Sequence, residues 1–227
     1  MITTSHRSGL RVITLDRPQR RNALTPDGLD ELAGAVADAT EPVCYLTGAG
    51  PAFCAGADLN TVESATPEQA EALARRGQGV ANALEEYDGV VIAGIDGAAR
   101  GGGVELALAC DVRIGTPEAT FAESGVALGL FGAWGGTARL PRIVGEGVAM
   151  DLAVSGRVID AEEAKQVGLI SRVTHNPLAV AESIAENDHR ALRVIKRRIR
   201  DDGTRSEQER REVDAFRALA AARQEHE

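Results

Sequence analysis

The stretch that decides the fold is VVIAGIDGAARGGGVELALACDVRI, residues 90–114. It begins with an uninterrupted apolar run, Val90–Ile95, which is typical of a strand buried on both faces. A glycine tract, residues 101–103, then opens a helix rich in Leu and Ala over residues 102–110. A shorter apolar run at residues 112–114 predicts the next strand. Strands that alternate with helices in this way predict an α/β architecture.

The same alternation continues on the N-terminal side of this stretch. Residues 10–15 and 43–46 are short apolar runs bounded by turn residues, and each predicts a strand. Thr25 followed by Pro26 predicts the start of a helix, because Thr is a good N-cap and Pro suits the first helical position. Thr66 and Gln69 form a capping box that predicts the start of another helix.

After residue 145 the strand signals become sparse. Residues 169–173 predict a last short strand, and residues 177–227 predict two helices separated by Asp-Asp-Gly at 201–203. A capping box formed by Ser206 and Glu209 predicts the start of the second helix. Its apolar stripe is thin and consists of Val213, Phe216, Leu219 and Ala220. A helix with such a stripe more often packs against another surface than forms a core of its own. An oligomer interface is one candidate for that surface.

Composition excludes several classes of protein. The chain has 227 residues, of which 44% are hydrophobic, enough for one compact domain and too many for a disordered chain. The net charge of −9 disfavours binding to nucleic acid or to an anionic membrane surface. Three cysteines without a CxxC pair and four scattered histidines disfavour a disulfide framework and a zinc site. The start has no apolar run of signal-peptide length and no run approaches a membrane span, so we expect a soluble, cytoplasmic protein.

Three familiar nucleotide or nucleophile motifs fail on individual residues. The dinucleotide-binding pattern G-x-G-x-x-G fails because Leu106 stands where the third glycine belongs. A P-loop needs Gly-Lys-Ser/Thr, and neither Lys165 nor Lys196 follows a glycine. The string G-x-S-x-G of a serine nucleophile elbow does not occur.

What remains is the chemistry of the backbone in two loops of small residues. The tract at residues 101–103 leaves peptide N–H groups uncovered at the positive end of a helix dipole. The second loop, residues 54–58, reads Cys-Ala-Gly-Ala-Asp. Two such loops can aim N–H donors at one oxygen and stabilise an oxyanion or an enolate. Small residues also permit close packing of helix and sheet, so the pattern alone leaves both interpretations open.

A few side chains near these loops are candidates for chemistry. Glu105 is a lone carboxylate in an apolar helix, which is costly to bury and therefore suggests a functional role. Asp111 ends that helix and is interpreted as structural, whereas Glu123 is either a turn carboxylate or a second acid/base. Trp134 suits the core and a pocket wall equally well, and Cys54 has no histidine nearby in sequence to activate it as a nucleophile.

At these residues the chain resembles the crotonase (enoyl-CoA hydratase/isomerase) superfamily. Five strings carry the resemblance, in the order of the family and over about residues 9–173. They are RPQRRNALTPDGLDEL, LTGAGPAFCAGADL, DGAARGGGVELALACDVRI, ALGLFGAWGGTARLPRIVG and SGRVIDAEEAKQVGLISRV.

The resemblance implies a fold and a ligand. It implies a crotonase-type ββα superhelix over residues 1–173, which would form the acyl-CoA-binding core, and a C-terminal helical region over residues 174–227 used in trimerisation. The expected ligand is an acyl-CoA thioester, with coenzyme A as part of the substrate and no other cofactor or metal. The expected assembly is a homotrimer or a dimer of trimers, without nucleic acid or membrane.

The resemblance also assigns roles to individual residues. Ala57 and Gly102 would donate the two N–H groups of the oxyanion hole to the thioester carbonyl. Glu105 matches the first catalytic glutamate of the family and would be the acid/base. The residues expected along the coenzyme A arm are Arg20, Arg21, Ala23, Leu24, Ala57, Asp58, Leu59 and Asn60, and the two arginines would meet its phosphates.

Two departures from the family pattern stand out. Gly125 occupies the position where the second catalytic glutamate is expected, and Glu123 lies two residues upstream. In an extended strand Glu123 would point the same way and lie about 6–7 Å away, which makes it a candidate second acid/base. Family members also usually continue past the point where this chain stops, with a segment that helps to close the coenzyme A site.

The implied function is that of an enoyl-CoA hydratase-like lyase that stabilises an enolate, with fatty acid metabolism as the expected setting. Because of Gly125, two alternatives remain open. One is an acyl-CoA-binding protein without turnover. The other is an isomerase, dehalogenase or decarboxylase of the same family that uses Glu105 or Glu123.

Overall fold

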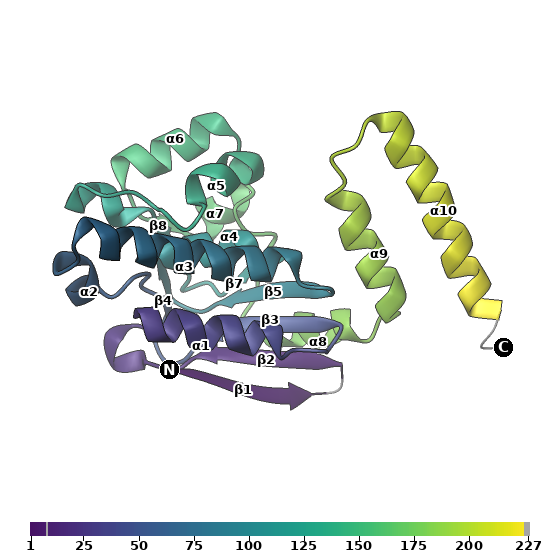
Figure 1. Ribbon diagram of the computed structural model, residues 1–227, viewed down its shortest axis with the longest axis horizontal. Coiled ribbons are helices and arrows are strands. Elements are labelled where there is room, and N and C mark those ends of the chain that lie inside the picture. The colour runs from purple at the N-terminus through teal and green to yellow at the C-terminus, as the bar shows by residue number, and fades with distance from the viewer. Residues whose placement is uncertain (8, 225–227) are drawn as a thin grey trace.

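The computed structural model describes residues 1–7 and 9–224. The chain folds into two β-sheets, and helices cover both faces of the larger sheet (Figure 1). The strands are β1 (Ile2–Arg7), β2 (Leu10–Leu15), β3 (Val43–Gly48), β4 (Ala52–Cys54), β5 (Val90–Ile95), β6 (Ala98–Arg100), β7 (Val112–Gly115), β8 (Thr120–Ala122), β9 (Ile159–Asp160) and β10 (Arg172–Val173). The α-helices are α1 (Pro26–Ala37), α2 (Leu59–Glu63), α3 (Pro67–Glu86), α4 (Gly102–Ala109), α5 (Gly136–Val144), α6 (Glu146–Ser155), α7 (Ala161–Gln166), α8 (Pro177–Ala185), α9 (His189–Ile199) and α10 (Arg205–Gln224), and the 3₁₀ helices are η1 (Pro18–Arg20) and η2 (Ser124–Leu128). The α/β prediction is confirmed.

The larger sheet has the strand order β1-β2-β3-β5-β7-β10. Only the first pair is antiparallel, and the remaining neighbours run parallel. Apolar residues of each strand alternate between its two faces, as the twofold period of a strand requires. In β2, for example, Ile13 and Leu15 belong to the cluster beneath α1, α3 and α4, whereas Leu10 and Val12 belong to the cluster beneath α8. The sheet is therefore covered on both faces.

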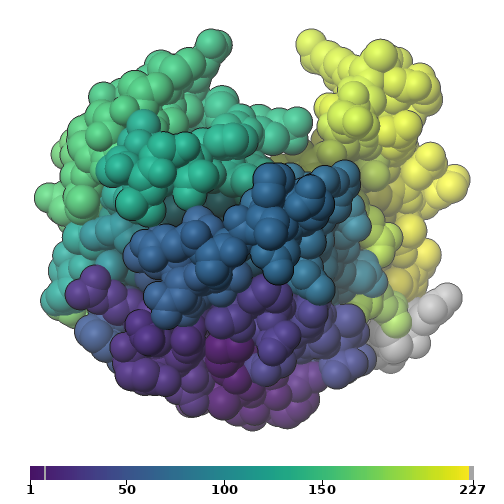
Figure 2. Space-filling view, turned by 60° about the vertical axis from the view of Figure 1, so that its left-hand side comes forward, coloured from purple at the N-terminus to yellow at the C-terminus, as the bar shows by residue number. Residues whose placement is uncertain are grey.

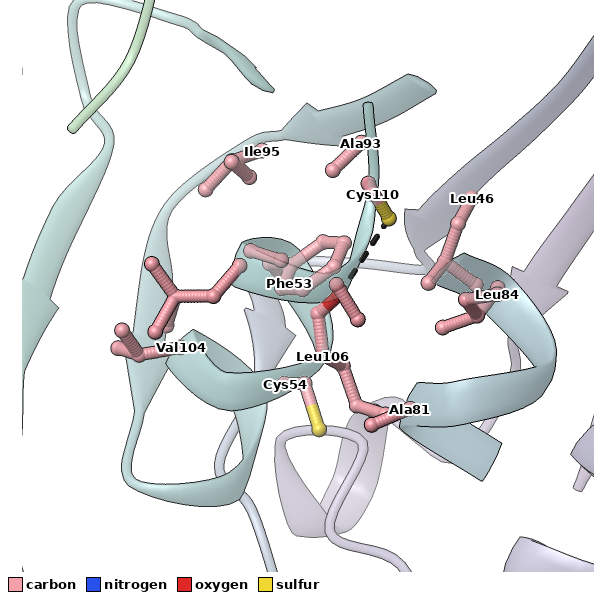
Figure 3. Packing of buried hydrophobic residues seen from close by; sticks show 14 of the residues in the cluster. Leu46, Phe53, Cys54, Ala81, Leu84, Ala93, Ile95, Val104, Leu106 and Cys110 are labelled. Atoms are coloured by element: carbon pink, nitrogen blue, oxygen red, sulfur yellow. Dashed lines mark hydrogen bonds between the residues drawn. The ribbon is translucent and has the colours of Figure 1, made fainter. Parts of the chain in front are cut away.

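The larger cluster joins the sheet to the helices that carry the candidate site. Phe53 is fully buried and lies among Leu46, Leu84 and Leu106, which come from β3, α3 and α4 (Figure 3). The Sγ of Cys110 donates to the carbonyl of Leu106 at 3.3 Å, so this thiol is one of the buried groups of the core. Close packing of this kind fixes the position of α4 against the sheet.

The smaller sheet has the order β4-β6-β8-β9, and its first three strands are parallel. Parallel neighbours end at the same edge of a sheet, so the loops that follow β4, β6 and β8 lie together. The segments directly after these strands contain, respectively, Ala57, Gly102 at the start of α4, and the pair Glu123 and Gly125. Topology thus gathers segments that are up to seventy residues apart in sequence. The short strands of this sheet, like β1, lack a clear apolar pattern and were not predicted.

The C-terminal region differs from the prediction in three details. Only residues 172–173 of the expected strand at 169–173 pair with β7. Three helices rather than two are present in the described part of residues 177–227, because Asp188 caps a new helix through the N–H of Ala191. The capping box of α10 is formed by Thr204 and Glu207, two residues earlier than predicted.

The last two helices stand at one side of the sheet. Helices α9 and α10 form an antiparallel pair, and α9 contacts β5 (Figure 1). In the space-filling view a notch separates the yellow C-terminal helix from the green segments of the core (Figure 2). The predicted apolar stripe of α10 is largely open to solvent, with Val213 and Phe216 69% and 76% exposed. Residues 225–227 of the predicted last helix lie outside the described residues.

Candidate active site

The first part of the candidate site is the N-terminus of α4. The chain leaves β6 through Gly101, whose φ of 45° is a conformation that favours glycine. The N–H of Gly101 donates to Ala122 at 2.9 Å, which ties this turn to β8. Gly102 follows as the first residue of the helix, and its N–H has no carbonyl one turn earlier in the helix to bind. This N–H therefore is available to a ligand at the positive end of the helix dipole.

The second part is the loop after β4. Leu24 donates its N–H to Gly56 at 2.8 Å and accepts the N–H of Asp58 at 2.9 Å, which makes a parallel bridge between Leu24 and Ala57. In such a bridge the N–H of Ala57 points away from Leu24. Gly56 has a φ of 84°, and a Cβ there would lie 2.8 Å from the nitrogen of Gly102. The two loops are thus in direct contact, which depends on glycine at position 56.

Both loops border one cavity of about 420 Å³. Ala57, Gly102 and Glu105 line it together with residues of α2, α3 and the segment 124–134. Most of the lining is apolar, and Glu105 is the only carboxylate among the described residues that border it. An apolar cavity with a few convergent polar groups is typical of a small-molecule site.

Glu105 lines this cavity and is held in place by two backbone donors. Its Oε1 accepts the N–H of Trp134 and the N–H of Gly136, each at 2.7 Å. The side chain is 2% exposed, and burial raises the pKa of the carboxyl, while the two N–H groups and the charge of Arg139 oppose that rise. A carboxyl with a raised pKa at the edge of a cavity is suited to move a proton near neutral pH.

Trp134 determines how closely the helices meet around the site. A Cβ on Gly102 would lie 2.4 Å from the Trp134 ring, and one on Gly77 would lie 2.1 Å from it. The ring thus packs between α3 and α4, is 4% exposed and also lines the cavity. The two roles considered for this residue, core and pocket wall, are both filled.

Glu123 does not take the place that an extended strand would give it. Strand β8 ends at Ala122 and a 3₁₀ helix begins at Ser124, so the twofold alternation that predicted its direction and its separation of 6–7 Å does not apply. Its carboxyl borders a neighbouring cavity rather than the one beside Glu105. Burial and the nearby charge of Glu105 raise the pKa of Glu123 to about 8. Gly125, in contrast, lines the cavity of Glu105.

The residues expected along a coenzyme A arm have different environments. Leu59 lines the cavity and is 53% exposed, whereas Ala23 and Leu24 are buried and do not line the cavity. Arg20 and Arg21 are exposed on the surface and do not line the cavity, and Asn60 is likewise exposed.

Asp58 has a structural role at the edge of the loop. Its Oδ2 pairs with Nη1 of Arg17 at 2.6 Å, and its Oδ1 accepts the N–H of Asn60 at 3.0 Å at the start of α2. The hydrogen bond and charge of Arg17 lower the pKa of Asp58. Arg17 also donates to the carbonyl of Ala23 at 3.1 Å, so this pair holds the segment before Leu24 against the loop that carries Ala57.

The cysteines are not arranged for nucleophilic chemistry. Cys54 is fully buried, and burial raises the pKa of its thiol to about 12. Within residues 1–7 and 9–224, no cluster of three or more His, Cys, Asp or Glu side chains is arranged to hold a metal ion. No described helix has both the length and the apolar composition to cross a membrane.

Several residues of the cavity were not predicted as site residues. They come mainly from α2, α3 and the segment after β8, and they include Ala55, Val62, Leu73, Ser124, Leu128, Leu130 and Phe131. Apolar residues recur at helical spacing in α3, but such a stripe indicates burial and does not say whether a core or a cavity lies against it.

The fold and this pair of loops define a member of the crotonase superfamily, as comparison with known proteins shows. Residues 5–226 match the family described as Enoyl-CoA hydratase/isomerase. The crystal structure of an enoyl-CoA hydratase from Bacillus anthracis superposes with a TM-score of 0.91 at 33% identity, covering 97% of this chain and 91% of that one. The chain therefore belongs to the enoyl-CoA hydratase/isomerase family.

Curated relatives agree with this placement. A crotonyl-CoA hydratase of Syntrophomonas wolfei is 39% identical over 169 residues, which are 72% of this chain and 65% of that protein. A 2,3-dehydroadipyl-CoA hydratase of Escherichia coli K12 is 34% identical over 238 residues, covering 100% of this chain and 92% of that protein. The match to the first relative thus spans slightly less than two thirds of its length.

Proposed function

We propose that this protein is an enzyme that binds an acyl-CoA thioester and adds water to a 2-enoyl-CoA. The observation that carries this proposal is that Ala57, Gly102 and Glu105 border a single cavity. Two backbone donors and one acid/base around an apolar space are the groups that hydration of an unsaturated thioester requires.

In the proposed reaction the thioester carbonyl oxygen accepts the N–H groups of Ala57 and Gly102. Addition of water to C3 moves electrons through C2 onto that oxygen, where the two donors and the dipole of α4 stabilise the negative charge of the enolate. Donors that are already in place need no reorganisation as the charge develops.

Glu105 is proposed to move the proton. Its Oε1 is occupied by the N–H groups of Trp134 and Gly136, which leaves Oε2 to take a proton from the attacking water and to return it to C2. One carboxyl then serves both steps, the water oxygen bonds to C3, and the sum is H and OH added across the double bond.

The proposal extends to the organisation of the chain. We propose residues 1–173 as the acyl-CoA-binding core, residues 174–227 as the region used in assembly into trimers or pairs of trimers, and the cytoplasm as the location. Among the remaining predicted residues, Arg20, Arg21 and Asn60 are exposed and free to meet the coenzyme A moiety, and Leu59 borders both the cavity and solvent.

The experiment is a pair of incubations in D₂O, one with crotonyl-CoA and one with butyryl-CoA. Loss of the enoyl absorbance with formation of 3-hydroxybutyryl-CoA is the expected result, together with α-deuteration of butyryl-CoA. Deuterium exchange at the α-carbon without hydration would contradict the hydratase proposal but would still support stabilisation of an enolate. Binding without either reaction would indicate an acyl-CoA-binding protein.

A further inference from the structure

A second cavity of about 180 Å³ lies next to the candidate active site. It is formed by η2, α5 and α6, and its wall is predominantly apolar. The apolar contributions come from Val126, Phe131, Leu140, Pro141, Ala149, Met150 and Ala153, and the polar ones from Glu123, Thr137 and Glu146. No step of the proposed hydration uses this space.

Glu123 lines this cavity, and one oxygen of its carboxyl group has no hydrogen-bond partner among the described residues. The residue is 9% exposed, and its Oε1 is buried with no partner among the described residues. An unsatisfied buried polar atom costs about 1–3 kcal/mol, so an incompletely paired carboxyl group on a residue that lines a cavity suggests that a ligand supplies a partner. Because the pKa of Glu123 is raised to about 8, the group is a neutral carboxylic acid at pH 7 and is able to donate as well as accept.

The two cavities share part of their walls. Phe131 and Gly132 line both of them. Phe131 is 71% exposed, so little packing holds its ring in one position. Gly132 and Gly136 have no side chains, and a Cβ on either one would lie within 3 Å of the Glu105 carboxyl group. These two glycines therefore lie next to the proposed proton-transfer group and also line the second cavity.

We propose that the second cavity holds the acyl chain beyond the reacting carbons and that the Glu123 carboxyl hydrogen-bonds an uncharged oxygen on that chain. The substrate class is accordingly an acyl-CoA with a hydroxyl or carbonyl group several carbons from the thioester. This inference rests on the proposed function, since the thioester must first be held at Ala57 and Gly102 for its chain to pass Phe131.

The charge and the polarity of the residues that line the second cavity indicate which kind of acyl chain it binds. A carboxylate on the acyl chain would lie close to Glu146, and charge repulsion would lower the affinity of such a chain. A plain hydrocarbon chain would cover the Glu123 carboxyl group without offering it a hydrogen-bond partner. A neutral oxygen on an otherwise apolar chain avoids the charge repulsion and gives the Glu123 carboxyl group a hydrogen-bond partner.

The test measures binding, with saturated acyl-CoAs that cannot be hydrated as probes. Hexanoyl-CoA is compared by calorimetry with its hydroxy derivatives carrying the hydroxyl on the fourth, fifth or sixth carbon. We expect at least one derivative to bind the wild-type protein about tenfold more tightly than hexanoyl-CoA, the ratio that one net hydrogen bond confers.

Two variants and a control assign that difference to Glu123. Glu123→Gln keeps a donor and should retain the preference, whereas Glu123→Leu should abolish it and bind hexanoyl-CoA more tightly. Glu118→Gln, an exposed glutamate near the same sheet that lines neither cavity, should bind all probes as the wild type does.

Other results would overturn the proposal. Equal affinity of the wild type for all probes, or an equal loss for all probes in Glu123→Leu, would exclude a subsite at Glu123. If butyryl-CoA is bound and deuterated but no hydroxyl is preferred, the subsite alone is wrong. If no acyl-CoA is bound at all, both the proposed function and the subsite are wrong.

Discussion

Gly136 both holds the Glu105 carboxyl and leaves space for it. The N–H of Gly136 donates to Oε1 of Glu105 at 2.7 Å, and a Cβ on the same residue would lie 2.9 Å from that oxygen. A side chain at position 136 would therefore crowd the carboxyl group that the N–H of this residue binds. The segment around Gly136 is itself anchored, because Gln78 of α3 donates to the carbonyl of Ala133 at 2.9 Å.

The first prediction follows from this contact. Gly136→Ala should displace the Glu105 carboxyl or the start of α5, lowering hydration at least tenfold and destabilising the fold by about 1–3 kcal/mol through overpacking. Gly147→Ala is the matched control, since its Cβ meets no atom within 4 Å in α6 and Ala is favoured over Gly in a helix by about 0.5–1 kcal/mol. Thermal unfolding and steady-state rates on crotonyl-CoA check both variants, and equal behaviour of the two would contradict the prediction.

Replacement of Glu105 by Gln tests its role as the proton-transfer group. The amide oxygen of Gln can still accept the N–H groups of Trp134 and Gly136, so we expect the fold to be retained. The amide cannot take a proton from water, and the hydration rate should fall by about 10²–10⁴-fold. Rates are measured beside circular dichroism of the same preparations. Full activity in the Gln variant would show that another group moves the proton.

Gly125→Glu should raise the rate of hydration. Gly125 lines the cavity of Glu105, so a carboxyl built there enters the same space. Its Cβ would lie 3.3 Å from the carbonyl of Leu130, a tight contact that a small shift of this loop relieves. A second acid/base contributes about 10²-fold in favourable cases. The control is Gly125→Gln, which has the same shape and no titratable proton. An unchanged or lower rate in a folded Gly125→Glu protein would argue against a two-carboxylate mechanism in this chain.

Glu123 should make stability depend on pH. Its pKa is raised in the folded state from the ordinary value of 4.5 to about 8, so between these values the folded protein retains a proton that the unfolded chain releases. The free energy of unfolding must therefore fall as pH rises from about 4.5 to about 8, and the contribution of Glu123 is complete below that interval. Urea unfolding at several pH values should show this decline in the wild type, and the difference between wild type and Glu123→Gln isolates it. A constant difference across the interval would contradict the raised pKa.

The attachment of α9 to the core should depend on Asp111. This carboxylate pairs with Nζ of Lys196 at 3.0 Å and with Arg200 at 2.7 Å, and the Lys196 side chain is only 8% exposed. Asp111→Ala would leave a buried ammonium without its counter-charge, which costs about 3–5 kcal/mol.

Asp88 provides the control for this prediction. It also pairs with α9, through Arg193 and Arg197, but its side chain is 64% exposed. Asp88→Ala should therefore change the free energy of unfolding by less than about 1 kcal/mol. Hydrogen exchange of the backbone amides of α9 distinguishes the two variants. Equal protection of these amides in both variants would contradict the prediction that Asp111 attaches α9 to the core.

Much of the fold was predictable because it depends on local patterns. The continuous apolar run Val90–Ile95 predicted a strand buried on both faces, and β5 lies in the middle of the larger sheet with all six residues buried. The capping box of Thr66 and Gln69 predicted the start of α3, and both of its hydrogen bonds are present. Strands of three residues carry too few apolar positions to show a period, which explains why β4, β6 and β8 were missed.

The sequence by itself determined the family, the two small-residue loops and the unusual carboxylate Glu105, because each depends on residue type and short spacing. The tertiary structure alone decided which of these groups share a cavity. Ala57 and Gly102 meet because β4 and β6 are parallel neighbours whose ends lie at one edge. Glu123 faces a different cavity because a 3₁₀ helix begins after it, and no local pattern of residues specifies that turn of the chain.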